Sequence, residues 1–562
     1  MTDIKVYGPV TPLSQELHAE KYRPTGESFR DAMLRIAGAL QDYPEHFHTF
    51  KDILYAQRFL PAGRIQTSVG SLRRTTAFNC FLSGVIEDSM GSIMQRAAEA
   101  AETMRLGGGI GYDFSRLRPR GERIKSLDSK ASGPISFMGI YDAICQTIAS
   151  AGHRRGAQMA VLRVDHPDIL EFIRAKRNDD KLQGFNISVG VTDEFMQCLE
   201  YKRGFDLRFD GKVYETVDPQ YLWDEIMRST WDWAEPGILF IDRINKSNNL
   251  YYCETIEATN PCAEQPLPPF GACLLGSFNI AKYVANGRFD WSQFIADIPP
   301  VVRALDNVID RTIYPLKEQE TEAKQKRRMG IGVTGMANAI EAMGHPYGTD
   351  SYLQAQDEIL RTLRDKCYSA SVDLAIEKGP FPLYDERYLK SEFIGRLPIE
   401  LQNRIKEHAI RNSHLTSIAP TGTISLTADN ISSGIEPPFT LEYDRTIKTF
   451  DGERVERVHD YGAKFLGVKG LTADEIDAET HVNVLCRAQQ WVDSSISKTC
   501  NVGSHVTYDE FKDLYLMGYK QGAKGLTTFR ASGKRFGILN AVEAPAAEAC
   551  YIDPDTGKKT CD

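Results

Sequence analysis

The residues best suited to chemistry stand in one short segment near the middle of the chain. Asn260, Cys262 and Glu264 place an amide, a thiol and a carboxylate at alternate positions, and a second thiol, Cys273, follows closely. Pro261 disfavours a helical conformation for the residue before it, which predicts an extended segment whose alternate side chains point to one face. Such a face suits radical and acid/base chemistry on a bound sugar.

This segment resembles the active-site loop of ribonucleotide reductases, and the resemblance extends from about residue 55 to the C-terminus. It implies that Cys262 becomes a thiyl radical that removes the 3'-hydrogen of a ribose. It also implies that Glu264 is the base on the 3'-hydroxyl and that Asn260 hydrogen-bonds the sugar hydroxyls. From its residue type alone, Cys262 could equally be a small buried apolar side chain.

Reduction also needs two electrons, and the resemblance assigns them to Cys80 and Cys273. The two lie 193 residues apart, in Phe78–Leu82 and Gly271–Leu275 respectively. Only the folded chain can bring them within disulfide distance. Without the resemblance, each is more simply interpreted as a cysteine of the core.

The end of the chain has a tether followed by two thiols. Residues 541–548 are rich in Ala, Pro and Glu, and Cys550 and Cys561 come directly after them. The resemblance implies a flexible redox tail that resets the active-site disulfide by thiol exchange with a thioredoxin or glutaredoxin-type reductant. A zinc clip is the alternative, but two cysteines with no nearby His are too few ligands, so no metal site is expected.

Phosphate groups call for backbone N–H groups and hydroxyls, which Pro420–Ser425 offers. A helix beginning near Thr423 would present its first amides to an anion, although alone this is only a turn of small residues. The glycines 107–109 would let the backbone approach the substrate closely. The substrate-binding residues implied by the resemblance are Arg64, Asn79, Gly108, Gly109, Pro420, Thr421, Gly422, Thr423, Ile424 and Ser425.

Gly330–Gly335 fits the GxGxxG pattern of dinucleotide-binding folds. The preceding residues, 324–328, are charged and cannot be the buried strand that this fingerprint requires. We therefore reject a dinucleotide site there. Close packing of a short strand against a helix beginning near Met336 explains the glycines more simply.

The source of the radical decides the subclass of reductase. Relatives that use a separate radical-generating subunit carry two adjacent tyrosines late in the chain, whereas Lys524–Arg530 contains none. The pattern looks like the adenosylcobalamin-dependent class, in which that cofactor supplies the radical. A catalytic subunit with a separate radical-generating subunit is the alternative, and a nucleotide-sensing protein without catalysis is the alternative from another class.

A helical run before the triple glycine points to regulation. Its apolar stripe fits either the core or a dimer contact, and comprises Met90, Ile93, Met94, Ala97, Ala98, Ala101 and Met104. The resemblance implies a homodimer with a deoxynucleoside triphosphate effector bound by Asp88, Ser89, Arg118 and Lys176. The charged segment 176–183 would link effector and active site, and by composition it is a solvated loop.

The chain divides into an N-terminal helical region (1–55), a catalytic α/β region (56–540) and the tail (541–562). The first region contains one clear helix and little else, which leaves no room for an ATP-binding regulatory domain. Strand-like runs at 159–164, 185–189 and 237–241 alternate with helical runs such as 303–313 and 351–378, the order of an α/β fold. The resemblance implies a ten-stranded α/β barrel of two five-stranded halves around a central finger loop.

Composition agrees with a cytoplasmic enzyme. The eleven scattered cysteines fit a reducing compartment, and the N-terminus has no apolar export signal. No window is apolar enough for a membrane span. The net charge of −9 argues against a polynucleotide partner.

Overall fold

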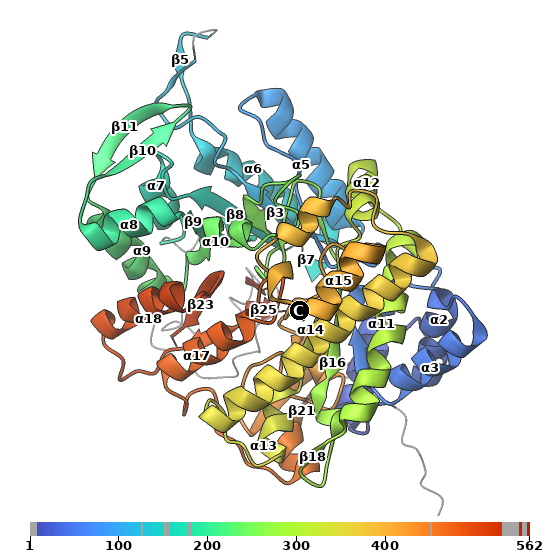
Figure 1. Cartoon of the computed structure of the whole chain (residues 1–562). Coiled ribbons are helices and arrows are strands. Elements are labelled where there is room, and N and C mark those ends of the chain that lie inside the picture. Colours follow the sequence, from blue (N-terminus) through green and yellow to red (C-terminus); the bar gives the residue numbers. More distant parts are fainter. Residues whose placement is uncertain are drawn as a thin grey trace, which may run out of the picture.

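The computed structural model describes residues 8–124, 127–150, 154–155, 157–177, 181–449, 452–530, 550–552 and 559–561. Strands lie in the middle of the molecule with helices around them, which confirms the predicted α/β class (Figure 1). In the described part of the chain, no helix is long and apolar enough to cross a membrane.

The N-terminal region contains three helices, so the prediction of a single helix was wrong. They are α1 (Pro12–Tyr22), α2 (Phe29–Leu40) and α3 (Pro44–Tyr55). α2 is the predicted helix, with Met33, Ile36 and Leu40 fully buried. α1 and α3 each begin at a proline, which is favourable in the first turn because its missing N–H has no partner there.

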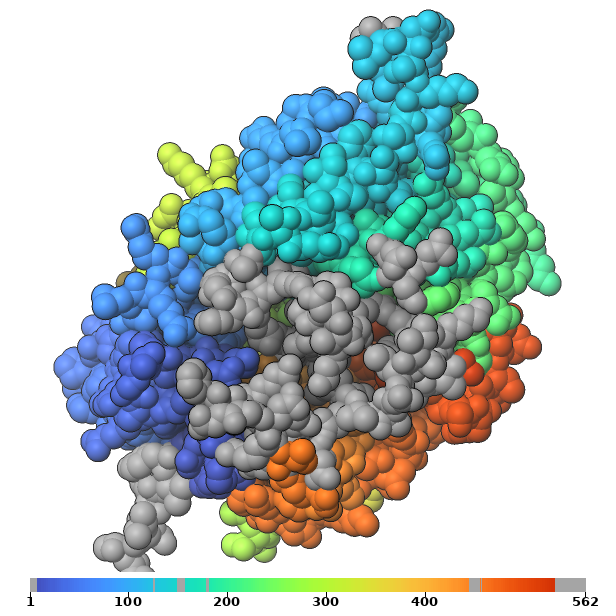
Figure 2. All heavy atoms as spheres, turned by 180° about the vertical axis from the view of Figure 1, so that it is seen from behind, coloured from blue at the N-terminus to red at the C-terminus, as the bar shows by residue number. Residues whose placement is uncertain are grey.

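These helices pack on the rest of the chain and form no separate unit. The carboxylate of Asp429 accepts the N–H groups of Val10 and Thr11, and Ser14 donates to the carbonyl of Leu426. In Figure 2 the N-terminal segment, in blue, borders on the orange segment that contains these partners.

Eight strands form one sheet in the order β15-β2-β3-β8-β9-β12-β23-β22. β2, β3, β8, β9 and β12 are mutually parallel, while β15 and β23 run antiparallel to them on either side. The strands are β2 (Cys80–Leu82), β3 (Gly109–Asp113), β8 (Gln158–Arg163), β9 (Phe185–Val191), β12 (Gly237–Phe240), β15 (Ala272–Cys273), β22 (Thr499–Asn501) and β23 (Gly525–Phe529).

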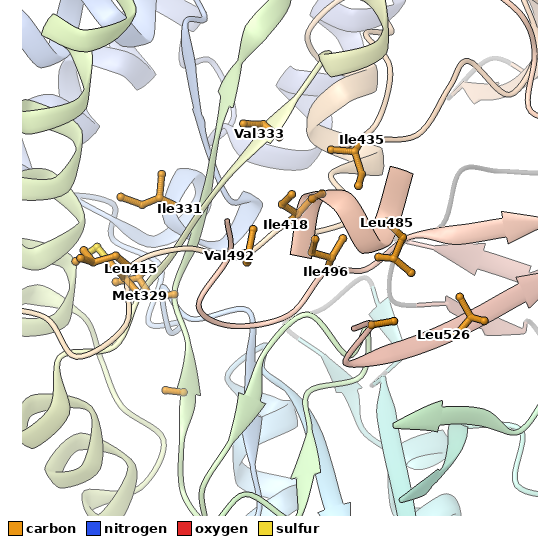
Figure 3. Packing of buried hydrophobic residues seen from close by; sticks show 14 of the residues in the cluster. Met329, Ile331, Val333, Leu415, Ile418, Ile435, Leu485, Val492, Ile496 and Leu526 are labelled. Atoms are coloured by element: carbon orange, nitrogen blue, oxygen red, sulfur yellow. The ribbon is translucent and has the colours of Figure 1, made fainter. Parts of the chain in front are cut away.

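A second group of strands consists of β1 (Phe59–Pro61), β16 (Leu275–Asn279) and β19 (Gly330–Thr334). Isolated bridges continue it in parallel, from Ile331 to Thr416 and from Ile418 to Ile496. Figure 3 shows the apolar side chains that pack along this path, from Met329 to Leu526 on β23.

The long helices cover the strands on the outside. α11 (Trp291–Arg311) packs against α14 (Asp350–Lys378), which also contacts α17 (Ala478–Gln489), and α17 lies beside α18 (Tyr508–Gln521) (Figure 1). α14 matches its prediction closely. α11 begins earlier than the predicted run 303–313. It contains Pro299 and Pro300, and because prolines normally break a helix, the sequence predicted a start after them.

The remaining elements are shorter connections and hairpins. The helices are α4 (Gly63–Ser68), α5 (Met90–Arg105), α6 (Pro134–Thr147), α7 (Ile169–Arg174), α8 (Asp193–Tyr201), α9 (Pro219–Trp233), α10 (Ile241–Lys246), α12 (Lys317–Lys326), α13 (Met336–Ala342), α15 (Ile399–His408) and α16 (Gly422–Leu426). The two-stranded antiparallel hairpins are β4 (Arg123–Ile124) with β5 (Ser129–Lys130), β6 (Ala149–Ser150) with β7 (Arg154–Arg155), β10 (Phe205–Phe209) with β11 (Lys212–Val217), β13 (Ala258–Thr259) with β14 (Pro266–Leu267), β17 (Val284–Ala285) with β18 (Arg288–Phe289), β20 (Glu442–Thr449) with β21 (Gly452–His459), and β24 (Cys550–Ile552) with β25 (Lys559–Cys561). Hairpin β4–β5 projects from the body of the molecule (Figures 1 and 2).

Candidate active site

The predicted chemical segment forms the tip of hairpin β13–β14, and it is a turn. The N–H of Ala263 donates to the carbonyl of Asn260 at 3.0 Å, and Ala263 has a positive φ of 65°. Asn260 Oδ1 accepts the N–H of Gln265 at 2.9 Å. The prediction of an extended conformation for 260–264 was therefore wrong. Pro261 favours an extended conformation for the residue before it, but these local hydrogen bonds close a turn.

The tip of this finger is held from both groups of strands. Asn186 on β9 donates its amide to the carbonyl of Pro261 at 3.2 Å. On the other side, the carbonyl of Glu264 accepts the hydroxyl of Ser417 and the N–H of Ser495, each at 3.0 Å. The finger thus lies between the two groups of strands, with its tip fixed by three hydrogen bonds.

Glycines make room for the finger. A Cβ on Gly111 of β3 would lie 1.9 Å from the carbonyl oxygen of Thr259, and one on Gly109 would lie 3.3 Å from Pro261 Cγ. On the other side, a Cβ on Gly330 would lie 2.2 Å from Gln265 Nε2. Gly111 and Gly330 need glycine because the finger passes where a side chain would stand, and Gly109 leaves the finger only narrow clearance.

The GxGxxG segment is explained by the same crowding. Gly330–Thr334 is itself the buried strand β19, and a Cβ on Gly332 would lie 2.2 Å from the carbonyl oxygen of Ser417. α13 begins at Met336, as predicted. Gly330 and Gly332 therefore leave room for the finger and for the segment around Ser417. The sequence had predicted a different reason for these glycines, which was close packing of the strand against a helix.

Cys80 and Cys273 face each other across two adjacent strands. They are register partners in the antiparallel pair β2–β15, both are buried, and they form no disulfide. Directly opposite residues of such a pair have Cα atoms about 4.5–5.5 Å apart, within the range of a disulfide. Burial raises the pKa of Cys80 to about 12 and that of Cys273 well above its usual value, so both are thiols at neutral pH.

The finger brings its polar groups to this pair of thiols. Asn260 Nδ2 lies 3.9 Å from Cys273 Sγ. After burial, the next cause of the raised pKa of each thiol is the negative charge of Glu264, and Cys262 adds to it at Cys273. All five predicted catalytic residues therefore meet at one place.

Glu264 has the surroundings of a base that works near neutrality. Its side chain is 2% exposed, and Oε2 has no hydrogen-bond partner among the described residues. Burial raises the pKa of Glu264 to about 7, against the opposing effect of its hydrogen bonds. Cys262, at the tip, is half-buried and is thus the finger's thiol that remains reachable.

The predicted contacts at the glycine-rich turn lie beside Cys80. A Cβ on Gly107 would lie 2.7 Å from a terminal nitrogen of Arg64, whose charge also acts on Cys80. A Cβ on Gly108 would meet the ring of Phe81 at 2.7 Å. Asn79 donates its N–H to the carbonyl of Cys273, and its buried Oδ1 has no partner among the described residues. An unpartnered buried oxygen here is an acceptor available to a ligand.

The predicted phosphate loop forms the short helix α16, which begins at Gly422. Thr421 adopts a left-handed conformation, with φ 56°, and its hydroxyl accepts the N–H of Gly434 at 2.8 Å. Thr334 Oγ1 lies 2.9 Å from both the Thr421 and the Ser425 hydroxyls. These two hydroxyls therefore hold the loop to β19 and the segment around Gly434.

Three of the four predicted effector residues lie together. Arg118 Nε donates to Asp88 at 2.6 Å, and the Ser89 hydroxyl caps α5 by accepting the N–H of Ser92. The fourth, Lys176, is not part of this cluster. Its ammonium pairs with Glu235 at 2.7 Å, and both side chains are nearly buried. The prediction of a solvated loop was wrong for Lys176, because this ion pair draws it inward, and residues 178–180 lie outside the described part of the chain.

The apolar stripe of α5 divides into two parts. Ile93, Ala97 and Met104 are buried, whereas Met90 and Met94 are 60% and 46% exposed. The edge of the stripe with Ile93, Ala97 and Met104 therefore packs on the core, and the edge with Met90 and Met94 is exposed to solvent as an apolar surface.

The backbones of the two tail cysteines are paired. Cys550 and Cys561 are register partners of the antiparallel pair β24–β25, and β24 contacts β9.

Sequence reasoning missed the residues that position the finger. Asn186 could have been suspected, because it carries an amide within a mostly apolar strand-like run. Nothing in the local sequence distinguishes Ser417 or Ser495 from the many other serines.

The geometry agrees with comparisons to known proteins. The family model for the ribonucleotide reductase barrel domain matches residues 78–463 and 469–529. The chain belongs to the ribonucleotide reductase family. In this reductase, residues 260–264, 80 and 273 all fall within the matched domain.

Named relatives cover nearly the whole chain. A vitamin B12-dependent ribonucleoside-diphosphate reductase of Mycobacterium tuberculosis is 35% identical over 96% of this chain and 79% of its own length. One of Thermoplasma acidophilum is 32% identical over 96% of this chain and 72% of its own length. A ribonucleoside-diphosphate reductase subunit alpha of Chlamydia pneumoniae is 24% identical over 90% of this chain and 56% of its own length.

Proposed function

We propose that the protein reduces ribonucleoside diphosphates to 2'-deoxyribonucleotides with adenosylcobalamin as its cofactor. The observation that carries the proposal is the meeting of the finger residues with the opposed pair Cys80 and Cys273. The relatives named as vitamin B12-dependent ribonucleoside-diphosphate reductases support both the cofactor and the diphosphate substrate.

The residues divide the work as follows. The Cys262 radical removes the 3'-hydrogen, and Glu264 takes the 3'-hydroxyl proton while Asn260 holds the sugar hydroxyls. The 2'-hydroxyl leaves as water, and Cys80 and Cys273 give two electrons and two protons as they form a disulfide. The hydrogen returns from Cys262 to C3', which restores its radical. The pKa of Glu264, raised to about 7 by burial, suits proton transfer at neutral pH.

A cofactor bound at the finger tip would supply the radical directly to the thiol of Cys262. Adenosylcobalamin, through its weak cobalt–carbon bond, would supply an oxidant for one thiol. Cys262 and Ala263 are half-buried, so they are the described residues of the tip that the cofactor would meet. β23 carries Thr527 and Thr528, and Thr528 is buried against the Tyr515 hydroxyl at 2.9 Å. A tyrosine relay from a separate subunit has no counterpart in that strand.

Substrate phosphates would bind between the glycine-rich turn and α16. Arg64 and the N–H groups at the start of α16 are the cationic and dipolar groups for them. The Asn79 Oδ1 atom supplies an acceptor for the ribose.

The tail would reset the active-site disulfide. A cross-strand pair at Cys550 and Cys561 matches the Cα spacing of a disulfide, which supports a tail dithiol that exchanges with Cys80–Cys273 and then with thioredoxin or a glutaredoxin-type protein.

Regulation would use the α5 surface. Met90 and Met94 offer an apolar contact for a second copy, which supports a homodimer. A deoxynucleoside triphosphate effector would bind where Asp88, Ser89 and Arg118 cluster at the start of α5.

The strand pairings support a closed ten-stranded barrel of two five-stranded halves. β15 on β2 and β23 on β12 are antiparallel junctions between the halves. The bridges at Thr416 and Ile496 extend β16 and β19 toward the chain segment that precedes β22. The finger between the two halves would then be its centre.

The test is an anaerobic assay of the purified chain with adenosylcobalamin, a dithiol, and ribonucleoside di- and triphosphates in parallel. We expect deoxynucleoside diphosphate formation by the chain alone and none by Cys262→Ala. Activity that needs a second, metal-containing subunit would identify the alternative class. Nucleotide binding that persists in both proteins without any turnover would identify a nucleotide sensor.

A further inference from the structure

A cavity lies at the edge of the sheet opposite the finger tip. It has a volume of about 600 Å³ and opens between α10, α14 and the segments that follow α17 and α18. That volume is typical of small-molecule sites, which span about 300–1,000 Å³.

Strand directions place this cavity away from Cys262. The finger tip lies at the N-terminal ends of the parallel strands, next to Gly109 of β3 and Asn186 of β9. The cavity is lined by α10, which follows the C-terminal end of β12, and by Lys524, which precedes the antiparallel β23. Parallel strands have their N- and C-terminal ends on opposite edges, so the cavity is not part of the active site.

The lining is strongly cationic. Among the described residues, its charged side chains are one carboxylate, Glu392, and five cations: Arg243, Lys246, Arg364, Arg396 and Lys524. Glu392 pairs with Arg396 and lies 4.0 Å from Lys246, and Arg364 pairs with Asp365 at 2.7 Å, so the cations still outnumber the carboxylates. This concentration of positive charge occurs in a chain whose net charge is −9. A concave cationic surface concentrates anions.

Two of the guanidinium groups are held in place by aromatic rings. Arg243 lies over the ring of Tyr519 at 4.6 Å and donates to the carbonyl of Ala523 at 2.9 Å. Arg364 lies over the ring of Trp491 at 5.0 Å. Guanidinium groups fixed in this way lose little entropy when they bind a phosphate, which favours binding.

Lys524 joins the cavity to the finger. Its buried ammonium donates to the carbonyls of Asp493 and Ser494, at 2.6 and 2.7 Å. The next residue, Ser495, donates its N–H to the carbonyl of Glu264. Burial lowers the pKa of Lys524 to about 8, so a neighbouring anion would favour its charged form.

We propose that this cavity binds a nucleotide, with its phosphates on Arg243 and Arg396 and its base near Trp491. Phosphate groups match guanidinium forks: that of Arg243 is held by Tyr519, and that of Arg396 would exchange its pairing with Glu392 for the phosphate. The indole of Trp491, with glutamine side chains in the same lining, suits a flat, hydrogen-bonding base. The site is separate from the substrate and effector sites proposed above. Through Lys524 and Ser495, its occupation is transmitted to the segment that carries Glu264.

Equilibrium dialysis with radiolabelled ATP tests the proposal on the full chain. We expect the variant Arg243→Ala/Arg396→Ala to lose one equivalent of ATP per chain, with that site weakened at least tenfold. The matched control Arg288→Ala, at an exposed arginine of hairpin β17–β18, should keep it. Equal stoichiometry and affinity in all three proteins would overturn the proposal.

Two further measurements make the result decisive. If inorganic triphosphate binds this site as tightly as ATP, the assignment to a nucleotide is overturned, because the base would then contribute nothing to the affinity. Hydrogen exchange on the unmodified protein covers the case of a variant that does not fold. We expect ATP to slow the exchange of the backbone amides of residues 486–492 and 519–524. Unchanged exchange in both segments would refute the site.

Discussion

The closest packing between the finger and the sheet gives the sharpest prediction, at Gly111. A Cβ there would lie 1.9 Å from the carbonyl oxygen of Thr259. Non-bonded carbon and oxygen atoms approach to about 3.3 Å, so Gly111→Ala must move the finger by about 1.4 Å. Misplacement of a reacting group by about 1 Å can cost about 100-fold in rate, or about 2.7 kcal/mol. We therefore expect kcat to fall at least about 100-fold.

The sheet supplies a matched control for this substitution. Gly190 lies in β9 of the same sheet, separated from β3 by β8, but a Cβ there would meet its nearest atom, Val161 Cγ1, at an ordinary 3.6 Å. Neither glycine has a positive φ, so backbone strain is not the difference between them. Gly190→Ala should keep kcat within about twofold, in keeping with a conservative change away from the site.

The assay is steady-state reduction driven by a dithiol, with far-UV circular dichroism and thermal unfolding to show that both variants are folded. A Gly111→Ala protein with undiminished kcat would refute the reasoning, because the finger would then have room that the packing denies it. Loss of activity in both variants would show that the sheet tolerates no added methyl group, and the argument from the finger would again fail.

Three other perturbations have definite outcomes. Because the pKa of Glu264 is raised to about 7, its base form fills as pH rises, so kcat/KM should climb up to about pH 7 and level off above it. Glu264→Gln should lower kcat at least about 100-fold and remove that limb, and an unchanged pH profile would exclude Glu264 as the base. Cys550→Ser should retain one turnover and dithiol-driven activity but lose thioredoxin-driven turnover, whereas normal thioredoxin-driven rates would contradict the tail relay. Arg118→Ala should weaken deoxynucleoside triphosphate binding at least tenfold with little change in unregulated kcat, and unaltered effector affinity would place that site elsewhere.

Local patterns were sufficient for elements with a helical period or a short, mostly apolar run. The apolar face of α2 repeats at the spacing of a helix, and β8, β9 and β12 are short, nearly continuously buried runs, so all four were recognisable. The same reasoning failed for α11, where two prolines inside the helix resemble a break. It also failed at 260–264, where hydrogen bonds from Ala263 and Gln265 close a turn.

The sequence by itself determined which groups are available: a thiol, a carboxylate and an amide in one segment, further thiols at Cys80 and Cys273, and glycines at 107–109. It also indicated the α/β class, because alternation of strand and helix is a local property. Only the tertiary structure decided that Cys80 lies opposite Cys273 and that Gly111 makes way for the finger, since contacts between distant segments leave no periodic trace in either one. The pKa of Glu264 depends on the same folding, because burial is what raises it.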